Sequence, residues 1–282
     1  NLWFSNEGAA KDNYGRISDW NVSAVTDMSN AFLNRTDFNE SIGNWDTSSV
    51  TNMYRMFYGA SNFNQPVGEW NTTSVTNMAS MFQNAQSFNQ PIGNWDTKAV
   101  TFLTGMFFYA QKFNQPIEEW NVSNVVSMKN MFAYASSFNH PIGSWDTSSN
   151  LDLRMMYKGA GAFNQSLNNW NVSKVTDMTS VFESTSLSSE NKGQIHATFS
   201  LNTNWPYDWS EFLPNQAPQF QTDGNLTVLE NETLVFEFNA TDSDGDTLSY
   251  TIQSGLDSQF FEVNATSGAL TFLTARDFEN PE

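Results

Sequence analysis

Carboxylates are the side chains in this sequence whose type and spacing could do chemistry. Asp and Glu number 30 against 12 Lys and Arg, which gives a formal charge of −18 at pH 7. Asp242, Asp244 and Asp246 alternate within one short stretch, and hard carboxylate oxygens suit Ca²⁺. The stretch is not an EF-hand loop, because its glycine stands at loop position 4 rather than 6 and Gln253 stands at position 12. The net charge argues against nucleic acid and anionic lipid as partners and favours divalent cations.

Groups that catalyse reactions are sparse. The chain has two histidines, His140 and His196, and neither stands beside a recognisable nucleophile. A carboxylate pair for glycoside hydrolysis stays open, but no pair stands out from the others. Without cysteine there is no disulfide framework and no thiolate zinc site, and without a run of 18 apolar residues nothing is expected to span a membrane. The sequence therefore predicts a protein that is not an enzyme.

Most of the chain that precedes this carboxylate stretch is an internal repeat. Tryptophan recurs with a constant 25-residue period, at Trp20, Trp45, Trp70, Trp95, Trp120, Trp145 and Trp170. This period predicts a repeat architecture, and its strict form ends near Phe182. A repeated surface presents the same positions many times, whereas an enzyme needs a few unlike residues that converge in one pocket. The period therefore favours binding over catalysis.

Each copy carries a pattern that predicts one short helix and one short strand. In the second copy four apolar residues have the i, i+3, i+4, i+7 spacing of one helical face, namely Met53, Met56, Phe57 and Ala60. Thr51 is placed to cap the first turn of this helix. Phe63, Val67 and Trp70 follow in a stretch broken by proline and glycine, which is typical of a very short strand. The predicted fold class is an α+β repeat solenoid of the leucine-rich-repeat type.

Polar residues recur at fixed places in the repeat. Asparagine recurs at one slot, at Asn39, Asn64, Asn89, Asn114, Asn139 and Asn164. This row predicts an internal ladder whose side-chain amides hydrogen bond to the backbone of the turns, with a ligand-binding surface as the alternative. The Asn or Asp after each Trp predicts an Asx turn rather than a row of metal sites, because alternate copies lack the charge. The tryptophans themselves are expected in the core rather than as a platform for sugars.

One copy departs from the pattern, because Asn150 stands where the other copies carry valine. A polar side chain at a core slot costs about 1–3 kcal/mol unless it is hydrogen bonded. We expect either a local shift that lets Leu151 fill the site or an Asn150 side chain turned towards solvent.

Several strings in the repeats resemble a known family. The Val-Thr-x-Met, Met-Phe-x-x-Ala and Phe-Asn-Gln-Pro-Ile-Gly-x-Trp-Asp strings, between about Gly15 and Phe182, resemble the BspA-like leucine-rich repeat surface proteins of bacteria. The sequence departs from that family in using Met or Phe where leucine is usual, and Ala where related repeats often have Cys. The resemblance implies a right-handed leucine-rich-type solenoid on a secreted or surface-anchored protein. Some members of that family bind host matrix proteins.

From Asn215 the sequence changes to alternating apolar and polar runs that predict the strands of a β-sandwich. Four motifs in this part resemble, in order, those of a cadherin-like repeat, and they lie at residues 228–231, 240–244, 266–270 and 277–279. The resemblance implies a partial all-β cadherin-like sandwich, because the last strands of such a domain would lie beyond Glu282.

The cadherin-like resemblance also implies a calcium site at each end of the domain. Three carboxylates would ligate calcium at the far end and two at the near end, namely Glu230, Asp277 and Glu279, then Asp242 and Asp244. The linker at residues 214–218 lacks the further Asp ligands of that family, so the near site is expected to be incomplete, and the far site lacks the next linker. An acidic surface loop without bound metal is the alternative.

The domain organisation and function follow from these patterns. We expect an N-terminal cap at 1–19, the solenoid at 20–187, a C-terminal cap and linker at 188–214, and the partial cadherin-like domain at 215–282. Both resemblances are to extracellular adhesion families, so we expect a monomeric, non-catalytic, calcium-binding protein outside the cell or on its surface that recognises protein or glycan. The alternative is the targeting or scaffold region of a larger secreted enzyme. An ice-binding face is not expected, because valines interrupt the threonine row Thr47, Thr72, Thr97 and Thr147.

Overall fold

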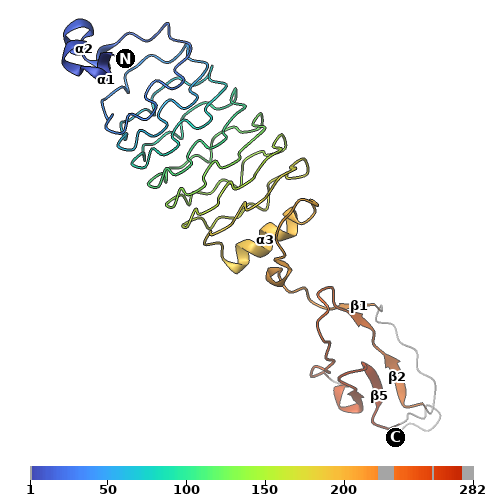
Figure 1. The fold of residues 1–282 in the computed structure, drawn as a ribbon. Helices are drawn as coiled ribbons and strands as arrows, with labels where there is room; N and C mark the ends of the chain where they lie inside the picture. The colour runs from blue at the N-terminus through green and yellow to red at the C-terminus, as the bar shows by residue number, and fades with distance from the viewer. Residues whose placement is uncertain (1, 222–231, 256, 275–282) are drawn as a thin grey trace. The chain divides into compact units, whose positions relative to one another are not determined.

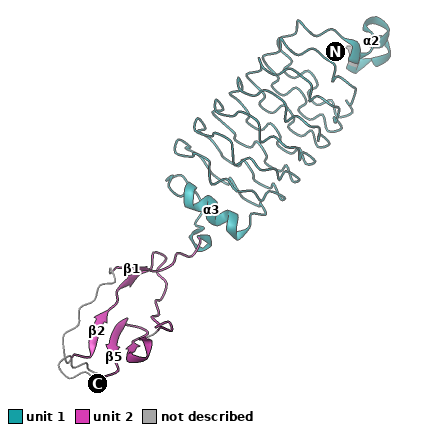
Figure 2. Cartoon of the chain, turned by 180° about the vertical axis from the view of Figure 1, so that it is seen from behind, with its two compact units in different colours: residues 1–213 teal, residues 214–282 magenta. Residues whose placement is uncertain are grey.

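The computed structural model describes residues 2–221, 232–255 and 257–274. The chain divides into two compact units, Asn1–Leu213 and Pro214–Glu282, which Figure 2 shows in two colours. The first unit holds the repeats, and Figure 1 shows their copies side by side in chain order. Among the described residues no helix has the length and apolar character needed to cross a membrane.

A helical segment precedes the repeats. It consists of α1 (Leu2–Ser5), α2 (Glu7–Tyr14) and the 3-10 helix η1 (Ile17–Asp19). Asn6 caps α2, since its side-chain oxygen accepts the backbone N–H of Ala9 at 3.0 Å. Phe4 packs edge-on against Phe32 of the first copy, with ring centroids 6.0 Å apart. The segment thereby covers apolar side chains at one end of the repeats.

Backbone hydrogen bonds join each repeat copy to the next. In the second copy the N–H of Arg55 donates to the carbonyl of Ala79 at 3.0 Å, and that of Phe57 donates to the carbonyl of Met81 at 2.9 Å. Every second N–H from Met53 to Gly59 donates in this way, and the acceptors are the carbonyls of Asn77, Ala79, Met81 and Gln83. Isolated parallel bridges connect the copies at Asp27, Asn52, Asn77, Phe102, Ser127, Asp152 and Asp177. This ladder holds the copies in register.

The helix predicted in each copy is wrong, because the backbone of this run forms successive tight turns. Met56 and Ala60 donate their N–H groups to carbonyls three residues earlier, whereas an α-helix uses the fourth residue back. Arg55 and Gly59 have φ angles of 54° and 71°, which a right-handed helix cannot accommodate. In the described part of the chain, every helix lies outside residues 20–187.

The strand predicted near residues 63–70 is also wrong, since this stretch is irregular. The parallel contacts lie elsewhere in the copy, at Asn52 and its equivalents, and they are single bridges rather than strands. The predicted α+β solenoid with one strand and one helix per coil is therefore replaced by stacked turns joined by a backbone ladder.

Aromatic columns fill the interior of the repeats. Phe57 and Phe63 of one copy stack at 3.9 Å, and each also stacks on its equivalent in the next copy. Every tryptophan from Trp45 to Trp170 is buried, and its indole N–H donates to a carbonyl 28 residues earlier, which lies in η1 for Trp45 and in the preceding copy for the others. The prediction that these tryptophans lie in the core is confirmed.

The repeated polar residues serve the backbone. The side-chain oxygen of Asn64 accepts the N–H of Asn89 at 2.9 Å, and the same bond recurs from Asn39 to Asn164, which confirms the asparagine ladder. The Asn or Asp after each Trp accepts the N–H two residues later, which confirms the Asx turns. Thr72 and its equivalents are buried and donate to the next copy, so this row offers no ice-binding face.

A second helical segment follows the last copy. It contains α3 (Ser189–Phe199) and the 3-10 helix η2 (Ser210–Phe212). Ser188 caps α3, since its hydroxyl accepts the N–H of Asn191 at 3.2 Å. The phenol oxygen of Tyr207 accepts the N–H of Phe182 at 3.1 Å. This bond satisfies a backbone donor in the last copy, where no further copy follows.

The second unit contains small antiparallel sheets. Its elements are β1 (Gln219–Phe220), β2 (Leu234–Glu237), β3 (Ala240–Thr241), the 3-10 helix η3 (Ser258–Phe260), β4 (Phe261–Val263) and β5 (Ala269–Phe272). β1 pairs with β3, and the other sheet has the order β2-β5-β4. The alternating run at residues 248–252, which on sequence pattern suits a strand of the predicted sandwich, is irregular. The predicted cadherin-like sandwich is wrong, because the described part of this unit has no buried apolar side chain and so no closed core.

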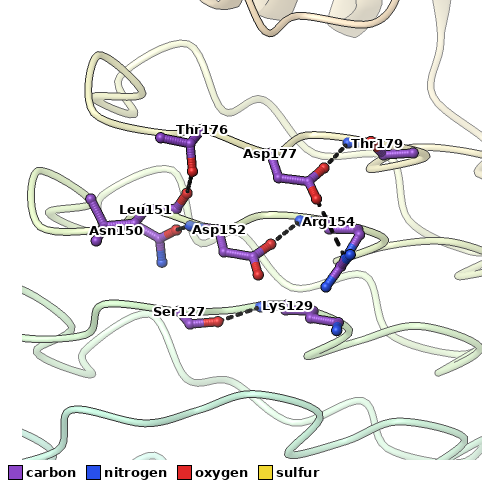
Figure 3. Close-up of polar contacts among 9 residues, drawn as sticks. All are labelled: Ser127, Lys129, Asn150, Leu151, Asp152, Arg154, Thr176, Asp177 and Thr179. Carbon is purple, nitrogen blue, oxygen red and sulfur yellow. Dashed lines mark hydrogen bonds and ion pairs between the residues drawn. The ribbon is translucent and has the colours of Figure 1, made fainter.

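Asn150 occupies the core slot without any local shift, so both alternatives predicted for it are wrong. Its side chain is 0% exposed, while that of Leu151 is 46% exposed. Its Oδ1 accepts the N–H of Asp152 at 3.0 Å, and its Nδ2 is buried without a partner. Figure 3 shows Asn150 beside Asp152. The copy keeps its backbone and accepts an unsatisfied donor instead.

Asn150→Val should raise the free energy of unfolding by about 1–2 kcal/mol, because it removes a buried unsatisfied amide and restores the valine of the other copies. Urea denaturation of the two proteins measures this difference. Val125→Asn, the reverse change one copy earlier, should lower stability by a similar amount. A less stable Asn150→Val variant would show that the amide contributes to the fold.

Candidate functional site

The carboxylates predicted to ligate calcium are only partly described. Glu230, Asp277 and Glu279 lie outside the described residues. Asp242 and Asp244 follow β3 in a turn. The structure therefore describes the two carboxylates of the predicted near calcium site but none of the far site.

The turn after β3 offers part of a calcium ligand set. Asp242 Oδ1 accepts the N–H groups of Asp244 and Asp246 at 2.8 and 3.3 Å. Asp244 Oδ2 accepts the N–H of Gln216. Asp242 Oδ2 is buried and has no hydrogen-bond partner, so it is the one orphaned oxygen of the turn. Within the described ranges no three Asp, Glu, His or Cys side chains gather closely enough to hold a metal ion.

The two histidines hold no catalytic arrangement in the described part of the chain. His196 accepts the indole N–H of Trp205 at its Nδ1, at 3.0 Å, and so serves the packing after the last copy. His140 is half-buried at the slot where other copies carry Gln65, Gln90 and Gln115. Neither position brings a nucleophile and a base together.

A more distinctive surface lies over the backbone ladder. We define the ladder face as the outward side chains of seven ten-residue runs, at 26–35, 51–60, 76–85, 101–110, 126–135, 151–160 and 176–185. Because the ladder fixes each slot, equivalent residues of different copies occupy equivalent places. A residue that departs from the type its slot requires is therefore a candidate for function rather than for structure.

Tyr109 and Tyr134 depart most clearly from their slot. Both have a φ of 58°, a left-handed conformation that is an outlier for a bulky residue and costs on the order of 1–2 kcal/mol. The same slot in the other copies holds the residues that tolerate it best, mainly Asn and Gly, at Asn34, Gly59, Asn84, Gly159 and Ser184. The two rings stack at 4.4 Å with 16° between their planes. The backbone at both positions is therefore strained, and the strain accompanies two half-buried aromatic rings on the ladder face.

Phe108 contacts this tyrosine pair, and Phe102 belongs to the same run of the fourth copy. Phe108 lies edge-on to Tyr109 at 4.8 Å and to Tyr134 at 6.0 Å. Phe102 takes a slot where Asp27 and Asn52 accept a backbone N–H, a bond that phenylalanine cannot make, and it is 46% exposed. We call these four residues of the fourth and fifth copies the aromatic cluster.

Gly159 makes room for one ring of the cluster. A Cβ atom at this position would lie 2.5 Å from Tyr134 Cδ1, and the φ of Gly159 is 69°. The Tyr134 ring thus lies against the backbone of the next copy at Gly159 and stacks on Tyr109. Glycine is required here by both the close approach and the left-handed backbone.

Charged residues continue the ladder face beyond the aromatic cluster. Figure 3 shows Arg154 between Asp152, whose Oδ1 accepts the Arg154 N–H at 2.9 Å, and Asp177, which lies 3.5 Å from its Nε. Partial burial works to raise the pKa of Asp177, but the Thr179 bonds and Arg154 lower it overall. Lys129 lies on the preceding copy in the same view. This end of the face therefore mixes cations with ionised carboxylates.

Sequence reasoning did not identify the aromatic cluster. The signal was present, since tyrosine stands twice in a slot that otherwise holds mainly asparagine and glycine. It has meaning only once that slot is known to be left-handed and at the surface. A helix, which we expected there, gives no reason to read the substitution as unusual.

Two overlapping segments of the chain, residues 3–107 and 91–195, match the family described as "Mycoplasma protein of unknown function, DUF285". The match covers the tryptophan-spaced repeats and ends before the second unit. The cadherin-like resemblance has no support from it. No curated protein and no solved structure matches the chain.

Gly159→Ala should lower stability by about 1–3 kcal/mol, because the new Cβ meets the Tyr134 ring and the left-handed backbone disfavours alanine. Gly161→Ala is the matched control, since a Cβ there meets nothing within 4 Å. Thermal unfolding compares the two variants. Equal melting temperatures would contradict the close approach of Tyr134 to this backbone.

Proposed function

Since the chain belongs to the DUF285 family of Mycoplasma proteins of unknown function, we propose its function from its own surface: it is a non-catalytic binding protein. It recognises an extracellular protein or glycan through the ladder face. The observation that carries this proposal is the aromatic cluster, whose two tyrosines occupy a strained backbone conformation that brings no evident gain to the core.

The chemistry of the cluster supports recognition rather than reaction. Aromatic side chains offer a large apolar contact area with few rotatable bonds, and tyrosine adds a polar hydroxyl. Residues of this kind dominate the affinity of binding surfaces when they are clustered and partly desolvated. Phe108, Tyr109 and Tyr134 meet this description, since they are half-buried and contact one another, and Phe102 adds an exposed ring on the same run.

An extracellular or cell-surface location is part of the proposal. It is supported by the resemblance of the repeats to BspA-like surface proteins and by the formal charge of −18, which disfavours anionic intracellular polymers as ligands. We propose that the protein acts as a monomer, since a single chain presents the whole ladder face.

The double variant Tyr109→Asn, Tyr134→Asn tests this function. It inserts the residue of Asn34 and Asn84, so the relief of strain should offset the lost ring stacking and leave stability within about 1 kcal/mol of the parent. Binding to a panel of immobilised matrix proteins and glycans should fall at least tenfold for every ligand that the parent chain binds. Tyr14→Asn, on α2 and outside the ladder face, is the control. Undiminished binding by the double variant would exclude the aromatic cluster as the site.

Calcium binding by the turn after β3 is a second proposal, and the orphaned Asp242 Oδ2 is the observation that favours it. Asp244 in the same turn is the second carboxylate that we propose for this cation, and its Oδ2 accepts the Gln216 N–H. The described residues supply too few ligands for a tight site, so we propose weak binding in the range of about 0.1–1 mM, as in extracellular modules.

Calorimetric titration with CaCl₂ should show a saturable response that Asp242→Asn abolishes and Asp257→Asn leaves intact. The change removes the charge of the orphaned oxygen while keeping the size of the side chain. The melting temperature of the parent should rise with calcium. A flat titration together with an unchanged melting temperature would remove calcium from the account of this turn.

A further inference from the structure

We propose that the partner of the ladder face is an acidic polypeptide segment that carries aromatic or large aliphatic side chains. This inference rests on the proposed function and specifies its ligand. Three features of the face carry it: the orientation of its rings, its charge relative to the rest of the chain, and an arginine held between two tyrosines.

The orientation of the rings favours a polypeptide over a glycan. A sugar stacks its C–H groups on an open aromatic face, which is the electron-rich side of the ring. Tyr109 and Tyr134 use faces on each other, and Tyr134 also lies against Gly159. The stacked pair therefore offers less open ring face than two separate rings would, and its hydroxyls suit the side chains and backbone of a peptide.

The charge of the ladder face sets it apart from the rest of the chain. Its outward slots contain four cations, Arg55, Lys129, Arg154 and Lys158, and four carboxylates, Asp27, Asp152, Asp177 and Glu183, so their net charge is 4 − 4 = 0. The whole chain carries −18, so this formal charge lies on the residues outside these slots. An acidic ligand is repelled by that acidic remainder and is repelled less by the neutral ladder face.

Arg55 supplies a receptor for a carboxylate. Its guanidinium lies over Tyr54 and Tyr58, at 5.0 and 5.2 Å from the ring centroids. Its Nε is buried without a hydrogen-bond partner, and no carboxylate pairs with it among the described residues. Arginine framed by tyrosines is a frequent centre of binding energy in protein interfaces, and a ligand carboxylate would pair with the partly exposed guanidinium.

The spacing of these features predicts a motif. Arg55 belongs to the second copy and the aromatic cluster to the fourth and fifth. Copies joined by a backbone ladder are about 4.8 Å apart, so two to three copies span roughly 10–14 Å. An extended chain covers about 3.3 Å per residue, so an acidic residue and an aromatic residue about three or four positions apart would reach both places at once.

Selection of a displayed library of random 12-residue peptides on the full chain tests the inference. We expect enriched peptides with Asp or Glu about three or four residues from Phe, Tyr, Trp or Leu. The affinity of the best synthetic peptide should fall at least tenfold in Arg55→Ser and in Tyr109→Asn, Tyr134→Asn. It should be unchanged in Lys98→Ser, which removes one positive charge outside the ladder face. Its binding should also weaken as salt rises.

Failure of this inference can be told apart from failure of the proposed function. No enrichment of acidic peptides, or enrichment that Arg55→Ser and the tyrosine variant leave unchanged, would overturn the inference. If the matrix-protein and glycan panel then shows a ligand that depends on Tyr109 and Tyr134, the proposed function stands with a different partner. If no ligand on either panel depends on these residues, both fall.

Discussion

The hydrogen bonds from every second backbone N–H of one copy to the carbonyls of the next are the interaction on which the rest of the structure depends. Their constant offset, from Met53 to Asn77 and from Phe57 to Met81, fixes the length of each copy. An inserted residue in the loop would move every side chain of the next run to a different slot. The same offset places Phe over Phe and Trp over Trp. Because the ladder needs a next copy, N–H groups of the last copy lack that partner, and Tyr207 accepts one of them from Phe182.

The constraint that builds the core also makes the surface informative. Because the same backbone ladder recurs in every copy, the residues that occupy one slot in different copies share one structural setting. Where the slot requires a left-handed residue, asparagine and glycine satisfy it with little strain, and Tyr109 and Tyr134 do not. Asn150 shows the converse, since an unfavourable residue at a core slot leaves the backbone unchanged. The stack tolerates local penalties because each copy is held by both neighbours.

The sequence predicts some features of this structure and fails at others for physical reasons. The burial of the tryptophans, the asparagine ladder and the Asx turns could be predicted, because the apolar and hydrogen-bonding side chains that form them recur at fixed places in every copy. The helix could not be excluded, because the apolar spacing of Met53, Met56 and Phe57 also suits a run of tight turns with left-handed residues between them. The positive φ of Arg55 accompanies its backbone pairing with the next copy, and no local sequence pattern predicts it. The sandwich predicted for the second unit was wrong, since strand-like runs in a sequence do not by themselves form a closed core.

Scalar couplings across hydrogen bonds, measured by NMR on the deuterated chain, test the ladder most directly. The account predicts a coupling between the amide nitrogen of Phe57 and the carbonyl carbon of Met81 in the next copy. A coupling from Phe57 to the carbonyl of Met53 instead, as an α-helix requires, would contradict it.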